Sequence, residues 1–162
     1  MASKAIKGYM PQVTPDHHQA TAHKLKDKLN MATWNIRTLL QKGKLENIKQ
    51  EMKRMKLNIL GLSEVRWKRA GKITSGGHEI IYSGGTESEN GVGIIVDQTA
   101  SKAIKGYRAL SDRVLLVKIA GKPVDLNTIQ VYAPTVNSND EDLDKFYNDL
   151  EQRLNANPRI LS

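Results

Sequence analysis

Ile59-Leu60-Gly61-Leu62-Ser63-Glu64 decides the fold, because a short apolar run ends there directly on a carboxylate. The run predicts a strand that is buried on both faces. Upstream lie a run of strand formers at residues 31–34 and then four apolar residues at helical spacing: Leu45, Ile48, Met52 and Met55. A strand, a helix and a strand in this order form a crossover unit, so we expect the two strands to lie parallel and side by side.

Beyond Gly71 the chain changes to short strand-forming runs separated by glycine-containing turns. We expect antiparallel hairpins built from residues 79–83, 91–97, 114–120 and 124–132. A second helix is expected to begin near Ser138 or Asn139. Its buried face would consist of Leu143, Phe146, Tyr147, Leu150 and Leu154. The predicted class is therefore mixed α/β (α+β).

The composition predicts one modest hydrophobic core and a polyanionic partner. The 162 residues are 39% hydrophobic, include no cysteine and carry a formal net charge of +8. The missing cysteine excludes disulfides and thiolate metal sites, and no apolar run is long enough to span a membrane. With no secretory signal in the sequence, we expect an intracellular protein. Its basic excess would attract phosphates.

A duplicated segment stands at the start of the chain. Ala2-Ser3-Lys4-Ala5-Ile6-Lys7-Gly8-Tyr9 recurs letter for letter at residues 100–107. One short duplicate does not make a repeat architecture. Because residues 10–29 are polar and aperiodic, we expect a mobile leader at 1–29 and a folded domain at 30–162. The final residues 160–162 resemble the start of a strand, which predicts a domain that is cut short.

Charged and polar residues near the two predicted strands are the candidate site. Asn35 and Glu64 each end a strand of the crossover unit, at the edge where open α/β sheets bind ligands. A carboxylate there can hold a hard cation such as Mg²⁺, although position alone also allows an ordinary surface glutamate. Of two basic clusters, the first has the pattern of a solvated helix face and contains Lys42, Lys44, Lys49, Lys53, Arg54 and Lys56. The second follows Glu64 and contains Arg66, Lys68, Arg69 and Lys72.

Three motifs read together resemble the endonuclease/exonuclease/phosphatase superfamily. They are Thr33-Trp34-Asn35-Ile36-Arg37-Thr38-Leu39, residues 59–67 and Val131-Tyr132-Ala133-Pro134-Thr135. The resemblance covers residues 30–154. Within that superfamily the sequence is most similar to the endonuclease of RTE-type LINE retrotransposons and to the craniofacial development protein 2-like sequences derived from it.

The resemblance implies a partial four-layer α-β-β-α sandwich that hydrolyses DNA phosphodiesters with Mg²⁺ or Mn²⁺. Carried over, Glu64 is a metal ligand, Asn35 orients the metal site, and the Tyr132 hydroxyl contacts the scissile phosphate. The residues implied for nucleic-acid binding are Arg37, Arg66, Trp67, Lys68 and Arg69. Because the family acts on genomic DNA, the resemblance implies a nuclear or cytoplasmic location. It also implies a reverse transcriptase domain in a full-length parent protein.

Several alternatives stay open. The local sequence alone, without the resemblance, also allows Tyr132 to be a packed strand residue and Trp67 a core residue. The family's Gly-Asp-Phe-Asn and Ser-Asp-His motifs, which supply further acids and a general-base histidine, do not occur here. The resemblance therefore implies an endonuclease fragment that is inactive alone and holds the cation weakly, which leaves enzyme status open. The alternatives are a non-catalytic nucleic-acid-binding module and a phosphoesterase that acts on a non-DNA phosphate ester.

Overall fold

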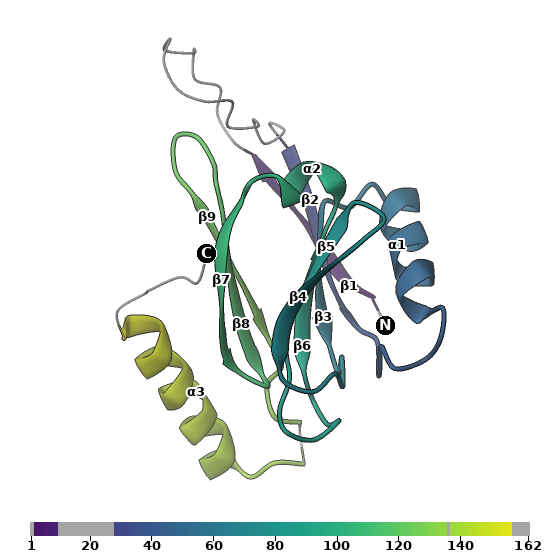
Figure 1. Ribbon diagram of the computed structural model, residues 1–162. Helices are drawn as coiled ribbons and strands as arrows, with labels where there is room; N and C mark the ends of the chain where they lie inside the picture. Colours follow the sequence, from purple (N-terminus) through teal and green to yellow (C-terminus); the bar gives the residue numbers. More distant parts are fainter. Residues whose placement is uncertain (1, 10–27, 136, 157–162) are drawn as a thin grey trace.

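Two β-sheets packed face to face form the protein, with one longer helix outside each sheet and a short helix at one end of the pair (Figure 1). This computed structural model describes residues 2–9, 28–135 and 137–156. The elements in chain order are β1 (Ala2–Tyr9), β2 (Lys28–Asn35), α1 (Lys44–Arg54), β3 (Ile59–Ser63), β4 (Ala70–Ser75), β5 (His78–Ser83), β6 (Val92–Val96), α2 (Gln98–Ser101), β7 (Ile104–Ser111), β8 (Val114–Ile119), β9 (Leu126–Val131) and α3 (Asp140–Asn155). The predicted α+β class is confirmed. None of the helices in these ranges is long and apolar enough to cross a membrane.

The larger sheet has the strand order β1-β2-β3-β6-β5-β4. Its β2 and β3 are parallel, with Asn35 paired to Ser63 at the end of the ladder, whereas the other neighbours are antiparallel. The predicted crossover unit is therefore confirmed. Because the two strands end together, Asn35 and the next residue after β3, Glu64, leave the sheet at the same edge.

Both faces of the larger sheet are covered, which explains why β3 and β6 are apolar throughout. Every residue of these two strands is buried. Leu60 and Ile95 pack with Met52 of α1 on the outer face. Ile59 and Ile94 pack on the inner face, against Leu115 and its neighbours from the second sheet. Successive strand residues alternate between the two cores, as the pleat requires.

The smaller sheet has the order β7-β8-β9, and α3 runs alongside it (Figure 1). The helix begins after Asn139, whose side chain caps the Asp142 N–H at 2.7 Å. The expectation that α3 buries an apolar face holds only in part: Leu143, Phe146, Leu150 and Leu154 are half-buried, whereas Tyr147 is 53% exposed and no residue of the helix is fully buried. Polar contacts also attach the helix, among them an Arg153 guanidinium that donates to the Leu110 carbonyl at 2.5 Å.

Three strands were not predicted from the sequence: β1, β4 and β7. β4 is an edge strand with no buried residue, so its sequence lacks the apolar alternation that marks a half-buried strand. β1 lies within the expected leader and pairs with β2, while residues 10–27 lie outside the described residues. The domain boundary at 29/30 therefore stays a prediction, although β2 already begins at Lys28.

A very close approach between the sheets occurs at Gly61 of β3. A β-carbon added there would lie 1.9 Å from Oε1 of Gln130, a buried residue of β9. The Gln130 amide reaches across the interface and donates to the Ser63 hydroxyl at 3.2 Å. Glycine at position 61 therefore leaves the space that this side chain occupies.

Gly61→Ala should destabilise the protein by about 2 kcal/mol, because the new methyl group overpacks the interface and displaces the Gln130 amide. Urea unfolding measures the change in the free energy of unfolding. In a Gln130→Ala background the same substitution should cost much less, since the conflicting side chain is gone. Equal costs in both backgrounds would contradict this account of the interface.

Candidate functional site

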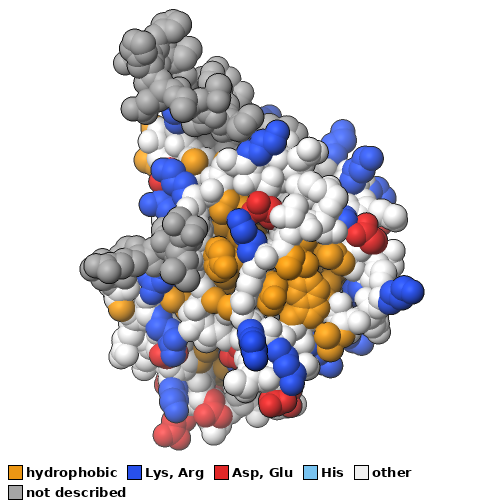
Figure 2. Space-filling view, viewed as in Figure 1, with side chains coloured by type: hydrophobic (Ala, Val, Ile, Leu, Met, Phe, Trp, Pro, Cys, Tyr) orange, Lys and Arg blue, Asp and Glu red, His pale blue; other side chains and the backbone are white. Residues whose placement is uncertain are grey.

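Surface charge alone does not locate a site on the face of the protein shown in Figure 2. On the face shown in Figure 2, Lys and Arg side chains are spread out, and acidic side chains gather at the lower end of α3, where its first turn lies. Lys53 and Lys56 of the first basic cluster are exposed, in agreement with a solvated face. Lys49 differs, because it is buried and its Nζ donates to the Ser75 hydroxyl at 2.8 Å. The solvated-face interpretation is wrong for Lys49, which joins α1 to β4.

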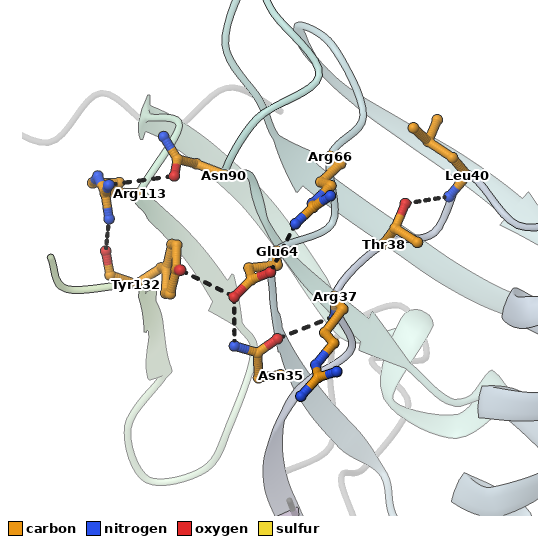
Figure 3. Close-up of polar contacts among 9 residues, drawn as sticks. All are labelled: Asn35, Arg37, Thr38, Leu40, Glu64, Arg66, Asn90, Arg113 and Tyr132. Carbon is orange, nitrogen blue, oxygen red and sulfur yellow. Dashed lines mark hydrogen bonds and ion pairs between the residues drawn. The ribbon is translucent and has the colours of Figure 1, made fainter. Parts of the chain in front are cut away.

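Glu64 lies at the centre of a polar cluster drawn from three chain segments (Figure 3). Its Oε1 accepts hydrogen bonds from Asn35 Nδ2 at 2.8 Å and from the Tyr132 hydroxyl at 3.1 Å. Its Oε2 accepts one from the Arg66 guanidinium at 3.2 Å. Asn35 ends β2, Glu64 follows β3 and Tyr132 follows β9. The structure thus brings together the three residues predicted for catalysis.

The protonation states of the cluster follow from these contacts. The hydrogen bond from Asn35 lowers the pKa of Glu64 below its ordinary value, and those from Tyr132 and Arg66 add to the effect against the opposing effect of burial. Burial and the hydrogen bond to Glu64 raise the pKa of the Tyr132 phenol. At neutral pH Glu64 is therefore a carboxylate and Tyr132 a hydroxyl donor.

The donors at this site fit a divalent cation that is held weakly. Proteins bind Mg²⁺ through one or two carboxylates, with water and substrate phosphate as the remaining ligands. Glu64 supplies one carboxylate. Asn35 orients it, since its own Oδ1 accepts a hydrogen bond from the Arg37 N–H at 3.1 Å. No group of three or more His, Cys, Asp or Glu side chains that could hold a metal occurs in the described part of the chain.

A cleft of about 460 Å³ opens beside Glu64. Its lining residues are Glu64, Arg66, Ser88, Glu89, Asn90 and Tyr132. The loop residues 88–90 were not predicted as part of the site. The available signal was the Asn90-Gly91 pair, a turn dipeptide that marks a strand boundary. The cleft is large enough for a phosphate group and its neighbours.

Strained backbone is concentrated around this cleft. Of the non-glycine residues with positive φ, five lie in the loops of the site: Arg37 (62°), Glu64 (58°), Arg66 (60°), Arg69 (64°) and Asn90 (49°). Side chains other than glycine adopt this region at a cost of about 1–3 kcal/mol each, and such residues cluster at functional sites. Their position supports a functional role for these loops.

The basic loop, residues 66–69, is fixed by two glycines. The Gly84 N–H donates to the Arg69 carbonyl at 2.6 Å, and the Arg69 N–H donates to the Gly85 carbonyl at 2.8 Å. A β-carbon at Gly84 would lie 1.7 Å from the Trp67 carbonyl oxygen, so only glycine fits there. The loop therefore presents exposed Arg66, Lys68 and Arg69 side chains from a fixed backbone.

Trp67 does not share the exposure of its neighbours. Its ring is partly buried, packs edge-on against Tyr82 with the ring centroids 4.9 Å apart, and contacts the outer core of the larger sheet. This position agrees with the core-residue alternative for Trp67. Arg37 is exposed beside Asn35 (Figure 3), so it shares the site edge with Arg66.

Comparison with known proteins identifies two relatives of the same kind. The chain is 40% identical over 136 residues to craniofacial development protein 2 of Bos taurus and 36% identical over 151 residues to craniofacial development protein 2 of Tragulus javanicus. These matches cover 83% and 93% of the chain but 23% and 26% of the relatives, so the chain spans about a quarter of their length. No protein-family model matches the chain. The predicted similarity to craniofacial development protein 2-like sequences is confirmed.

Gly84→Ala should displace the basic loop, because the added methyl group would overlap a backbone carbonyl that cannot rotate away. We expect a loss of about 2 kcal/mol or more in the free energy of unfolding and a change in tryptophan fluorescence. Gly85→Ala is the matched control, since a β-carbon there has its nearest neighbour at 3.7 Å. Equal effects of the two substitutions would contradict the close approach at Gly84.

The lowered pKa of Glu64 predicts a pH-dependent contribution to stability. A carboxylate whose pKa is depressed on folding stabilises the native state above its ordinary value of 4.5, and this contribution is lost as the pH falls through the folded-state pKa. Glu64→Gln should therefore flatten the decline in unfolding free energy below pH 4.5, as measured by urea titrations at several pH values. A decline in Glu64→Gln that is as steep as that of the wild type, or steeper, would contradict the prediction.

Proposed function

We propose that this chain is part of a divalent-metal-dependent DNA endonuclease domain of the endonuclease/exonuclease/phosphatase type. Glu64 would hold Mg²⁺ or Mn²⁺, Asn35 would orient Glu64, and Tyr132 would donate a hydrogen bond to the phosphate. The parent protein would be a LINE-type retrotransposon protein with a reverse transcriptase domain, or a sequence derived from one. The relatives are far longer than this chain, so the activity of the whole protein is part of the proposal.

The observation that carries the proposal is the Asn35–Glu64–Tyr132 cluster. An ionised carboxylate, an amide that orients it and a neutral phenol meet at the edge of a cleft. A carboxylate attracts a cation and a hydroxyl donor suits an anionic oxygen, so the pair matches the two charges of a metal-bound phosphate ester. When bound, the cation supplies charge stabilisation and a more acidic water.

Arg66 connects the metal site to the basic loop. Its guanidinium now bonds Oε2 of Glu64, although its side chain is 45% exposed. A cation bound to Oε2 would compete with this ion pair and free Arg66 for a phosphate. Arg66, Lys68 and Arg69 would then hold the DNA backbone without reading its sequence.

A non-catalytic nucleic-acid-binding module is the second candidate. It is favoured by the exposed basic loop together with the absence, within the described ranges, of a group of acids and histidines that could complete a metal centre. The two candidates share the DNA contacts and differ in whether Glu64 and a cation cleave the bound strand.

A duplex-binding experiment tests the proposal. Fluorescence anisotropy measures the binding across a salt series, with and without Mn²⁺. Mn²⁺ should strengthen binding by the wild-type chain, and Glu64→Gln should abolish that gain because the cation loses the carboxylate of the cluster. Arg66→Gln/Arg69→Gln should make the plot of log K against log salt shallower, with the magnitude of its slope reduced by about 0.9 for each phosphate that is no longer neutralised. The isolated chain is expected not to nick supercoiled DNA; nicking that depends on Glu64 would exclude the binding module and overturn the expectation that the fragment is inactive alone.

The matched control is Lys53→Gln/Lys56→Gln, which removes the same charge from the exposed end of α1 and the residues after it. This variant should keep the wild-type salt slope. A decrease in slope equal to that of the loop variant would show that net charge alone binds DNA. A Mn²⁺ effect that survives Glu64→Gln would overturn the metal site.

A further inference from the structure

Arg113, in the turn between β7 and β8, holds Tyr132 through three contacts. Its guanidinium donates to the Tyr132 carbonyl at 3.0 Å, and its own carbonyl accepts a hydrogen bond from the Tyr132 N–H at 2.9 Å. The guanidinium carbon also lies 5.0 Å from the centroid of the Tyr132 ring. One side chain and its backbone thus contact the amide, the carbonyl and the ring of the same residue.

The position of Tyr132 in the sheet explains why this support is needed. Val114 and Val131 form the terminal pair of the β8–β9 ladder, so Arg113 and Tyr132 stand opposite each other one step beyond it. The next residues are Ala133 and Pro134, and the proline has no N–H with which to extend the ladder. The Tyr132 carbonyl receives its hydrogen bond from the Arg113 side chain, which fixes the residue where the strand would otherwise fray.

The contacts of Arg113 continue to the other side of the cleft (Figure 3). Its guanidinium donates to Oδ1 of Asn90 at 3.3 Å. The Asn90 carbonyl accepts a hydrogen bond from the Arg66 N–H at 2.9 Å, and Arg66 is bonded to Glu64. A closed ring of contacts therefore runs from Tyr132 through Arg113, Asn90 and Arg66 to Glu64 and back to Tyr132.

An arginine suits this position for a specific physical reason. Its planar fork reaches two acceptors at fixed angles while its face interacts with an aromatic ring. A lysine would carry the same charge but, as a point donor, would not hold the Tyr132 carbonyl, the Asn90 side-chain oxygen and the Tyr132 ring together.

We propose that Arg113 is a positioning residue. It directs the Tyr132 hydroxyl toward the phosphate oxygen that would bind beside Glu64. This inference rests on the proposed function, in which that hydroxyl contacts a phosphate. Arg113 does not itself touch the phosphate. It acts by restricting the backbone and ring of Tyr132 and by tying them to the loop that contains Asn90.

The first experiment reads the position of Tyr132 without any ligand. In the full chain labelled with ¹³C at the tyrosine Cζ, Tyr132→Phe identifies the Tyr132 resonance by its disappearance. Arg113→Ala should shift and broaden this resonance, and Arg113→Lys should shift it less. Arg108→Ala is the matched control, because Arg108 sits on β7 and its guanidinium contacts the carbonyls of Arg153 and Ala156 in and after α3. It should leave the resonance unchanged.

The second experiment is a double-mutant cycle on Mn²⁺-dependent duplex binding. Tyr132→Phe and Arg113→Ala should each weaken binding roughly 5-fold, the effect of one hydrogen bond. Combined, they should weaken it little more than either alone, because both remove the same contact. Arg113→Lys should recover part of the affinity. Thermal melting of each variant identifies any weakening that comes from unfolding.

The outcomes separate the two proposals. An unchanged Tyr132 resonance in Arg113→Ala, or effects that add in the double variant, would overturn the positioning role and leave the proposed function standing. A shifted resonance together with a Tyr132→Phe variant that binds like wild type would support the positioning of Tyr132 while overturning its contact with phosphate.

Discussion

The residues between two packed sheets set the separation of the sheets. The site of this protein depends on that separation, because its residues come from both sheets. Gly61 admits the Gln130 side chain between the sheets, where it bonds the Ser63 hydroxyl. Three residues after Gly61 the chain reaches Glu64, and two residues after Gln130 it reaches Tyr132. The 3.1 Å hydrogen bond between these two is therefore a direct consequence of the packing that precedes it on both strands.

The parts of the fold that could be predicted from the sequence are those whose burial leaves a pattern. β3 and β6 were predicted because strands covered on both faces are apolar throughout, and α1 because one face carries Ile48 and Met52. β4 was missed because an exposed edge strand needs no apolar pattern. α3 was predicted from its periodic apolar face, but that face is only half-buried and Tyr147 is exposed, because the pattern does not tell how completely a neighbour covers it.

The site divides in the same way. Asn35 and Glu64 follow from strand ends in one crossover unit, whereas Tyr132 follows a strand of the other sheet and was predicted only through the resemblance. Asn90 and Arg113 were not predicted as site residues, since their contacts join segments that lie far apart in the sequence. The positive φ angles of Glu64 and Arg66 are equally invisible in sequence, because these residue types rarely adopt a left-handed backbone, whereas Asn90 precedes Gly91 in a typical turn pair.

The duplicated octapeptide has one sequence and two structures. The copy at Ala2–Tyr9 is a strand throughout, while the copy at residues 100–107 begins as the end of α2 and becomes β7 only at Ile104. In the second copy, Asp97 just upstream caps the helix through the Thr99 and Ala100 N–H groups. The same eight residues thus adopt different backbone conformations at two positions in one protein. Here the neighbouring residues, rather than the eight letters, carry the information that sets the backbone.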